Sequence, residues 1–185
     1  MGKIINSTFV SVDGVINHMP AWHFDYVDDE HDRISDEQLQ AAEALLMGRT
    51  TYEIYAGAWP QRTGRYADKI NSMRKYVAST TLRTADWANT RIIADDLVEA
   101  VAKLRAESGD VLMHGFGPVS HTLINHGLLD ELHLWVNPQF AGVGALGDTL
   151  LSEGTNTRLE LLGTRTLGSG VVLLSYRPRV ADQPG

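Results

Sequence analysis

Apolar residues along the chain fall into two patterns: short contiguous runs, which favour buried strands, and wider spacings, which favour helices. The runs that predict strands occupy residues 3–12, 75–79, 91–94, 111–113 and 130–136. Helical spacings lie between several of them and predict helices over residues 50–59, 67–73, 95–105 and 118–127. Because strands alternate with helices, the pattern predicts an α/β protein with a mostly parallel central sheet.

The end of the chain departs from this alternation. Two β-prone segments, residues 158–166 and 171–177, are joined by the turn Gly168-Ser169-Gly170. So short a connection predicts an antiparallel hairpin. The expected fold class is therefore α/β, with a mostly parallel mixed sheet and an antiparallel C-terminal hairpin. We expect one domain over residues 1–178 and a flexible tail over residues 179–185.

One helix boundary stays open. Ser35 is followed three residues later by Gln38, a capping box that predicts a helix starting there, with Leu39 and Leu46 on its inner face. Residues 45–47, however, fit a short buried strand equally well.

Composition removes several classes of function. The net charge of −7 is unfavourable for non-specific binding to nucleic acid, which needs a basic face. No apolar run is long enough to span a membrane, and the N-terminus lacks the features of a signal peptide. The absence of cysteine excludes disulfides and thiolate chemistry. A cytoplasmic protein is the default expectation.

Three polar turns follow predicted strands directly, at residues 48–51, 79–81 and 115–117. The carboxyl ends of parallel strands meet at one edge of a sheet, which is where open α/β sheets bind ligands. Two of the turns open into helices, whose first N–H groups favour phosphate. Together the turns predict a nucleotide site more strongly than any one of them does.

The turn at Gly115-Phe116-Gly117 is followed by Pro118, which suits the first position of a helix. It does not match the dinucleotide fingerprint, because Ser120 stands where the third glycine is expected. Since Gly117 precedes a proline, we expect its backbone to be extended.

Other candidate groups are weaker. The seven histidines invite a metal site, but His114, His121, His126 and His133 are spaced 7, 5 and 7 and include no H-x-x-x-H pair, so we expect no metal site. The acidic run from Asp28 to Asp32 is typical of a solvated surface, although Asp25 or Asp28 could face a substrate. Trp22 and Trp59 fit either the core or a ring-stacking surface for a substrate.

Several motifs resemble one known family. They are Ser11-Val12-Asp13-Gly14-Val15-Ile16, Leu46-Met47-Gly48-Arg49-Thr50-Thr51-Tyr52-Glu53, Trp59-Pro60, Lys75-Tyr76-Val77-Ala78-Ser79, the turn Gly115-Phe116-Gly117 and Gly127-Leu128-Leu129-Asp130-Glu131-Leu132. The series resembles the dihydrofolate-reductase-like family, which includes the reductase domain of bacterial riboflavin synthesis, over about residues 3–177. The resemblance implies a three-layer sandwich and an oxidoreductase that uses NADPH.

The resemblance also implies roles for particular residues. Asp13 and Gly14 would lie beside the nicotinamide, with Asp13 and Asp25 as candidate catalytic groups and Trp22 and Trp59 as candidate substrate contacts. Residues implied at the cofactor are Gly48, Arg49, Thr50, Ser79, Thr80, Gly115, Phe116, Gly117 and Pro118. Of these, Arg49 and Thr50 would hold phosphates, Ser79 would lie near the adenosine 2′-phosphate, and Gly115 to Gly117 would cradle the pyrophosphate.

Two readings of the function remain. The first is an NADPH-dependent reductase of a small heterocyclic or carbonyl-like substrate, of the pterin or aminopyrimidine class. The second is a nucleotide-binding or interaction protein that kept the fold without turnover, which the lack of a clear proton donor favours. True dihydrofolate reductases carry one carboxylate on their first helix for the pterin, and no single acid matches it here. The related reductases pair, and the apolar strand with Leu132, Leu134 and Trp135 fits a homodimer.

Overall fold

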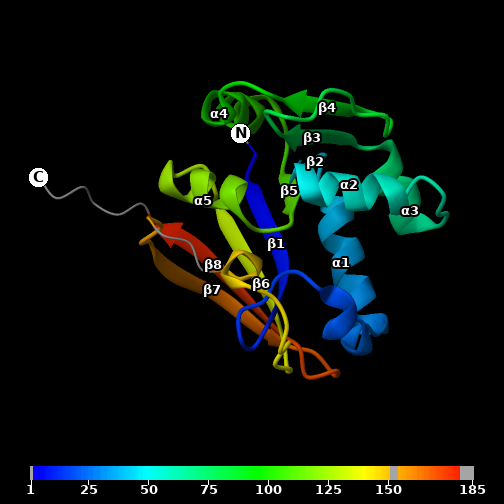
Figure 1. Ribbon diagram of the computed structural model, residues 1–185, viewed down its shortest axis with the longest axis vertical. Coiled ribbons are helices and arrows are strands. Elements are labelled where there is room, and N and C mark those ends of the chain that lie inside the picture. The colour runs from blue at the N-terminus through cyan, green and yellow to red at the C-terminus, as the bar shows by residue number, and fades with distance from the viewer. Residues whose placement is uncertain (1, 151–153, 180–185) are drawn as a thin grey trace, which may run out of the picture.

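The computed structural model describes residues 2–150 and 154–179, and its centre is an eight-stranded sheet (Figure 1). The strand order is β4-β3-β2-β5-β1-β6-β8-β7. The first six strands in this order are parallel, whereas β8 is antiparallel to both β6 and β7. The strands are β1 (Ile4–Ser11), β2 (Ala44–Gly48), β3 (Arg74–Ala78), β4 (Thr90–Ile93), β5 (Val111–His114), β6 (Glu131–Asn137), β7 (Arg158–Thr166) and β8 (Val172–Arg179).

Helices cover both faces of the sheet and make three layers (Figure 1). The first face packs against α4 and α5, and the second against α1, α2 and α3. The helices are α1 (Asp29–Ala41), α2 (Arg49–Ala58), α3 (Arg65–Ser72), α4 (Leu97–Glu107) and α5 (Pro118–Asn125), with short 3-10 helices η1 (Met19–Ala21), η2 (Phe24–Tyr26) and η3 (Leu146–Asp148). The predicted fold class, including the C-terminal hairpin, is confirmed.

Strand β2 shows why both layers form. Leu46 faces α4 and α5, while Leu45 and Met47 face α1, α2 and α3, and all three side chains are fully buried. A strand that is apolar on both faces is stable only when both are covered. The open boundary at residues 45–47 is therefore resolved as a strand.

The first helix begins earlier than its capping box predicts. α1 starts at Asp29, and the Asp28 carboxylate caps it by accepting from the His31 N–H at 2.8 Å. Ser35 and Gln38 thus lie inside the helix. The acidic run supplies its first turn, where negative charge is favourable at the positive end of the dipole.

Lys75 on β3 is a charged residue with no exposed surface. Its Nζ donates to the carbonyl oxygens of Ile70, Asn71 and Met73, each at 2.9 Å, and lies 4.5 Å from the centre of the Trp87 ring. Burial lowers the pKa of Lys75 to about 8, so at neutral pH the ammonium group remains charged. It caps the carboxyl end of α3 and fixes that helix to the sheet.

The expected tail at residues 179–185 lies largely outside the described residues, since Arg179 ends β8 and residues 180–185 are not described. Within the described part of the chain, no helix combines the length and the apolar character needed to cross a membrane.

Candidate functional site

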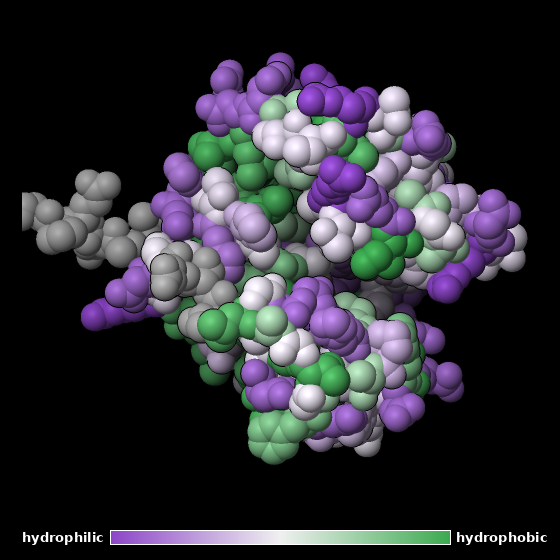
Figure 2. Space-filling model, in the orientation of Figure 1, coloured by the Kyte–Doolittle hydropathy of each residue, from purple (hydrophilic) through white to green (hydrophobic). Residues whose placement is uncertain are grey.

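A continuous groove runs along the carboxyl ends of β2, β3 and β5. It consists of three adjoining hollows of about 320, 270 and 290 Å³. We call them the cavity, the middle and the outer end of the groove. The cavity and the middle share the segments at residues 50–51 and 115–118, and the middle and the outer end share Arg49, Ala78, Pro118 and Val119. Figure 2 shows that the face in view is hollowed near its centre, with polar and apolar residues mixed around the recess.

Two helices begin at the middle of the groove. α2 starts after Gly48 and α5 after Gly117, and no side chain caps either first turn. Residues 48–51 and 115–120 line this hollow from both sides. Backbone N–H groups and the positive ends of two dipoles therefore converge there, an arrangement that fits a pyrophosphate.

The glycine turn between β5 and α5 has little freedom to change. Gly115 has φ of +77°, and an added Cβ would lie 2.3 Å from Thr51 Oγ1. Its carbonyl accepts from the Nδ2 of the fully buried Asn6 at 2.8 Å. The turn is thus fixed against both β1 and α2.

Gly117 differs from its expected conformation. Its φ of 156° and ψ of −150° lie in a region that is essentially restricted to glycine, so the extended geometry expected before Pro118 is wrong. An added Cβ would meet no atom within 4 Å, because it would point into open space. The groove therefore has room beside Gly117 that any side chain would fill.

Arg49 lies between the middle and the outer end of the groove. Its guanidinium donates to Glu53 Oε1 at 2.7 Å and to Thr81 Oγ1 at 2.8 Å. Ser79 and Thr80 line the outer end, where the Ser79 hydroxyl accepts from the Leu82 N–H at 3.0 Å. Asp95 lines the same end. Thr81 and Thr122 also line it, so a cation, four hydroxyl residues and one acid are the polar side chains at this end.

The cavity brings together side chains from at least six separate segments of the chain. Ser7, Thr8 and Phe9 come from β1, Ser35 and Gln38 from α1, Thr51, Ile54 and Tyr55 from α2, and His114 from the end of β5. Tyr66 of α3 and Asn17 complete its polar lining. Sequence reasoning missed most of these groups. Spacing could have indicated Tyr55, which lies one helical turn after Thr51.

Tyr55 and His114 form a partly buried polar pair in the cavity wall. Tyr55 Oη lies 3.1 Å from His114 Nδ1. Burial raises the pKa of Tyr55 to about 12 and lowers the pKa of His114 to about 4. Both groups are therefore uncharged at neutral pH, the tyrosine as phenol and the histidine as neutral imidazole.

The two carboxylates expected near the reaction do not line the cavity. Asp13 accepts from Ser11 Oγ at 2.5 Å and from the Ala141 N–H at 2.9 Å. These hydrogen bonds lower the pKa of Asp13 to about 2, and the residue ties the loop after β1 to the loop after β6. Asp25 is exposed on η2. Gly14 also lies outside the lining, although Ile16 and Asn17 of the same loop belong to it.

The two tryptophans expected at the substrate are placed behind the cavity wall. Trp22 is buried, and its Nε1 donates to the Asn17 carbonyl at 2.7 Å. Trp59 packs against Tyr55 and Tyr66, with ring centres 6.2 and 5.0 Å apart. Trp59 thus supports two residues of the lining without belonging to it.

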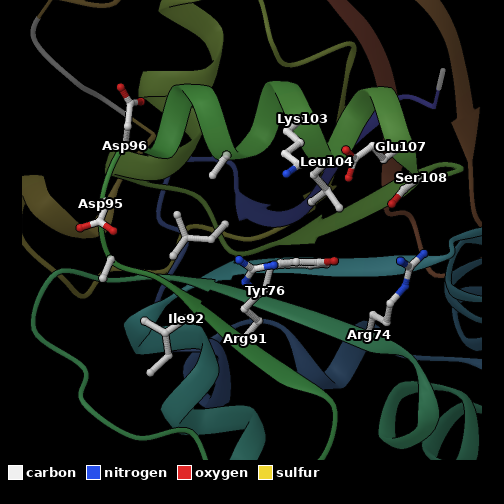
Figure 3. A pocket seen from close by; sticks show the side chains of 13 residues that line it. Arg74, Tyr76, Arg91, Ile92, Asp95, Asp96, Lys103, Leu104, Glu107 and Ser108 are labelled. Carbon is white, nitrogen blue, oxygen red and sulfur yellow. The ribbon is translucent and has the colours of Figure 1, made fainter.

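A separate pocket of about 220 Å³ lies between α4 and strands β3 and β4 (Figure 3). Its lining mixes cations and acids: Arg74, Arg91 and Lys103 with Asp95, Asp96 and Glu107. Arg74 is already paired with Glu43 at 3.1 Å. Because the lining holds equal numbers of cations and acids, the pocket favours neither an anionic nor a cationic ligand. No cluster of potential metal ligands occurs among the residues that the structure describes.

Comparison with known proteins identifies the family. The RibD C-terminal domain matches residues 2–173. The chain belongs to this family. Reductases of the family typically use NADPH. YyaP of Bacillus subtilis (strain 168), an uncharacterized protein, is 29% identical over an alignment of 181 positions. The alignment covers 94% of each chain.

Solved structures agree with the fold. A pyrimidine reductase-like protein from Corynebacterium diphtheriae superimposes with a TM-score of 0.68 at 13% identity, covering 96% of this chain and 92% of that one. The Thermotoga maritima diaminohydroxyphosphoribosylaminopyrimidine deaminase/5-amino-6-(5-phosphoribosylamino)uracil reductase gives a TM-score of 0.65 at 16% identity. The match covers 96% of this chain but 57% of that protein. The expected family and its reductase-domain fold are therefore confirmed.

Proposed function

We propose that the protein is an NADPH-dependent reductase of a small heterocyclic or carbonyl-like substrate. The observation that carries this proposal is the groove, in which a hollow at the start of two helices adjoins a cavity with polar groups that is large enough for a small ring. When bound, NADPH supplies a hydride to the substrate. Residues 48–51 and 115–118 would hold its pyrophosphate, and Arg49 with the turn at residues 79–81 would hold its adenosine end.

The test combines binding with turnover. NADPH is titrated by its fluorescence, and its oxidation is followed over a panel of pterins, aminopyrimidines and quinones. Saturable binding together with oxidation by one class of compound supports the reductase. Tight binding without oxidation by any of them favours the second reading, a nucleotide-binding protein that kept the fold without turnover.

Arg49→Ala should weaken NADPH binding about tenfold or more and NADH binding less. A charge-assisted contact to the 2′-phosphate is worth roughly 1.5–3 kcal/mol, and NADH has no such phosphate. The dissociation constants of both cofactors are measured for the parent and the variant. Arg91→Ala, which removes an exposed cation of the pocket in Figure 3, is the matched control. Equal affinities of the parent protein for NADPH and NADH would contradict the assignment.

The protein should form a homodimer through β7, one of the two edge strands of the sheet. The strand expected to pair, β6, is internal, and its Leu132 and Trp135 are buried within the chain. On β7, by contrast, Leu159, Leu161 and Leu162 are 42%, 55% and 39% exposed. Fully burying a leucine is worth roughly 1.5–3 kcal/mol.

Light scattering at micromolar concentration should therefore give the mass of a dimer, and Leu161→Glu should shift it to that of a monomer. Val12→Glu places the same charge at another exposed apolar residue and should leave the dimer intact. A monomeric parent protein, or a Leu161→Glu variant that stays dimeric, would count against this interface.

A further inference from the structure

The lining of the cavity carries no formal charge. Among the described residues that line it there is no lysine, arginine, aspartate or glutamate; its polar groups are hydroxyls, amides and the imidazole of His114. The low pKa of His114, a result of burial, keeps that imidazole neutral. A charged ligand would lose its hydration there without gaining an opposite charge, whereas a neutral polar ligand would find donors and acceptors.

Gln38 is the amide held most firmly in this lining. Its Oε1 accepts from Ser7 Oγ at 2.9 Å, and its Nε2 lies 3.1 Å from His133 Nδ1. The Ser7 hydroxyl in turn accepts from Trp135 Nε1 at 2.9 Å. Ser7 therefore donates its single hydroxyl proton to Gln38 Oε1. This hydrogen bond fixes the orientation of the Gln38 amide, with the amide oxygen toward Ser7.

The same chain of hydrogen bonds continues to the surface. His133 Nε2 lies 3.1 Å from Glu131 Oε2, and Lys3 Nζ donates to Glu131 Oε1 at 2.7 Å. In the tautomer that carries its proton on Nε2, His133 donates to Glu131, and its unprotonated Nδ1 accepts from Gln38 Nε2. The Gln38 amide thus keeps one N–H of Nε2 and one lone pair of Oε1 without a partner among these hydrogen bonds. A donor and an acceptor side by side recognise a neutral carbonyl or amide.

Tyr55 is a weakly acidic hydroxyl of the lining that has an orienting partner, His114. If the neutral His114 carries its proton on Nδ1, it donates to Tyr55 Oη, and the phenolic proton is left for a ligand.

We propose that the cavity takes an uncharged carbonyl compound, which Gln38 holds and Tyr55 protonates. The proposal rests on the proposed reductase function. The carbonyl carbon receives the hydride, the C=O π bond breaks, and the oxygen takes the proton of Tyr55 Oη to give an alcohol. The phenolate that remains is stabilised by the His114 N–H and regains a proton from water. Tyr55 is the catalytic residue of this step, and His114 is its positioning residue.

The charge preference is tested with two nearly isosteric aldehydes, methyl 4-formylbenzoate and 4-carboxybenzaldehyde. The neutral ester should raise the melting temperature of the NADP⁺-loaded protein and oxidise NADPH, while the carboxylate should bind at least tenfold more weakly. Equal binding of the two, preference for the carboxylate, or binding of neither overturns the proposal. The melting-temperature shift that NADP⁺ produces alone reports on the cofactor site separately, so failure of this proposal is distinguishable from failure of the reductase assignment.

Proton donation is tested with Tyr55→Phe, using Tyr76→Phe, which makes the same change outside the groove, as the matched control. Loss of a general acid lowers rates by about 10²–10⁴-fold. Tyr55→Phe should therefore lower kcat for the ester at least a hundredfold and leave the ester-induced melting-temperature shift unchanged. Tyr76→Phe, in the separate pocket of Figure 3, should keep kcat within a few fold. Unchanged kcat in Tyr55→Phe, or an equal loss in Tyr76→Phe, overturns the assignment.

His114→Phe tests the positioning role. Because His114 acts through Tyr55, this variant should lower kcat and leave KM unchanged, and it should add no further loss when combined with Tyr55→Phe. If the fold-losses in kcat of the two single variants multiply in the double variant, His114 acts independently of Tyr55, and its role in the proposal is overturned.

Discussion

Lys75→Met is expected to lower the free energy of unfolding by about 3 kcal/mol. The variant keeps most of the apolar stem but removes the ammonium group, so the carbonyl oxygens of Ile70, Asn71 and Met73 lose a shared donor. A buried polar group left unsatisfied costs roughly 1–3 kcal/mol. The expected loss is smaller than the sum over three carbonyls, because the variant also removes the desolvation of a buried charge.

Urea unfolding followed by circular dichroism measures this loss. Lys103→Met is the matched control: it makes the same change at an exposed lysine on α4 and should leave the midpoint nearly unchanged. If Lys75→Met unfolds at the same urea concentration as the parent, the ammonium group is not what fixes α3 to the sheet.

Most of the fold follows from local sequence signals. The run Val111-Leu112-Met113 predicts β5, Pro118 predicts the first residue of α5, and Gly127 follows its end with φ of +65°. Each signal is local, since apolar runs, a missing N–H and a positive φ restrict the backbone wherever they occur. The motifs around Gly48-Arg49 and Gly127-Leu128 then indicate the family.

The parts that the sequence did not predict depend on tertiary contacts. The capping box at Ser35 is a valid local signal, but Asp28 caps the helix about two turns earlier. Ile34, which lies between them, packs into the core beside Trp135. A helix that buries such a residue is extended by packing as well as by its cap. The local signal was therefore overruled.

The cavity illustrates the same limit for the site. The family resemblance makes Asp13 a catalytic candidate, yet its oxygens accept hydrogen bonds from Ser11 and from the backbone at residues 141–142. Gln38, Tyr55 and His114 come together only when α1, α2 and β5 are packed. No spacing along the chain indicates that Tyr55 Oη and His114 Nδ1 lie within hydrogen-bonding distance.

Gly117→Ala is expected to weaken NADPH binding at least a hundredfold while the protein stays folded. The added methyl group would occupy the open space beside the turn, where the proposed pyrophosphate lies. Two charge-assisted hydrogen bonds to phosphate are worth roughly 3 kcal/mol or more together, which is a factor of a hundred or more in affinity. The backbone strain at this φ and ψ is of order 1–3 kcal/mol, within a typical stability of 5–15 kcal/mol.

Gly64→Ala separates strain from the loss of the phosphate site. Gly64 also has positive φ, +107°, and an added Cβ there also meets nothing within 4 Å, but it precedes α3 and does not line the groove. Both variants should lower the melting temperature by a few degrees, and only Gly117→Ala should abolish the NADPH titration. A folded Gly117→Ala protein that binds NADPH normally would show that the turn is a connector, and the cofactor assignment along the groove would fail with it.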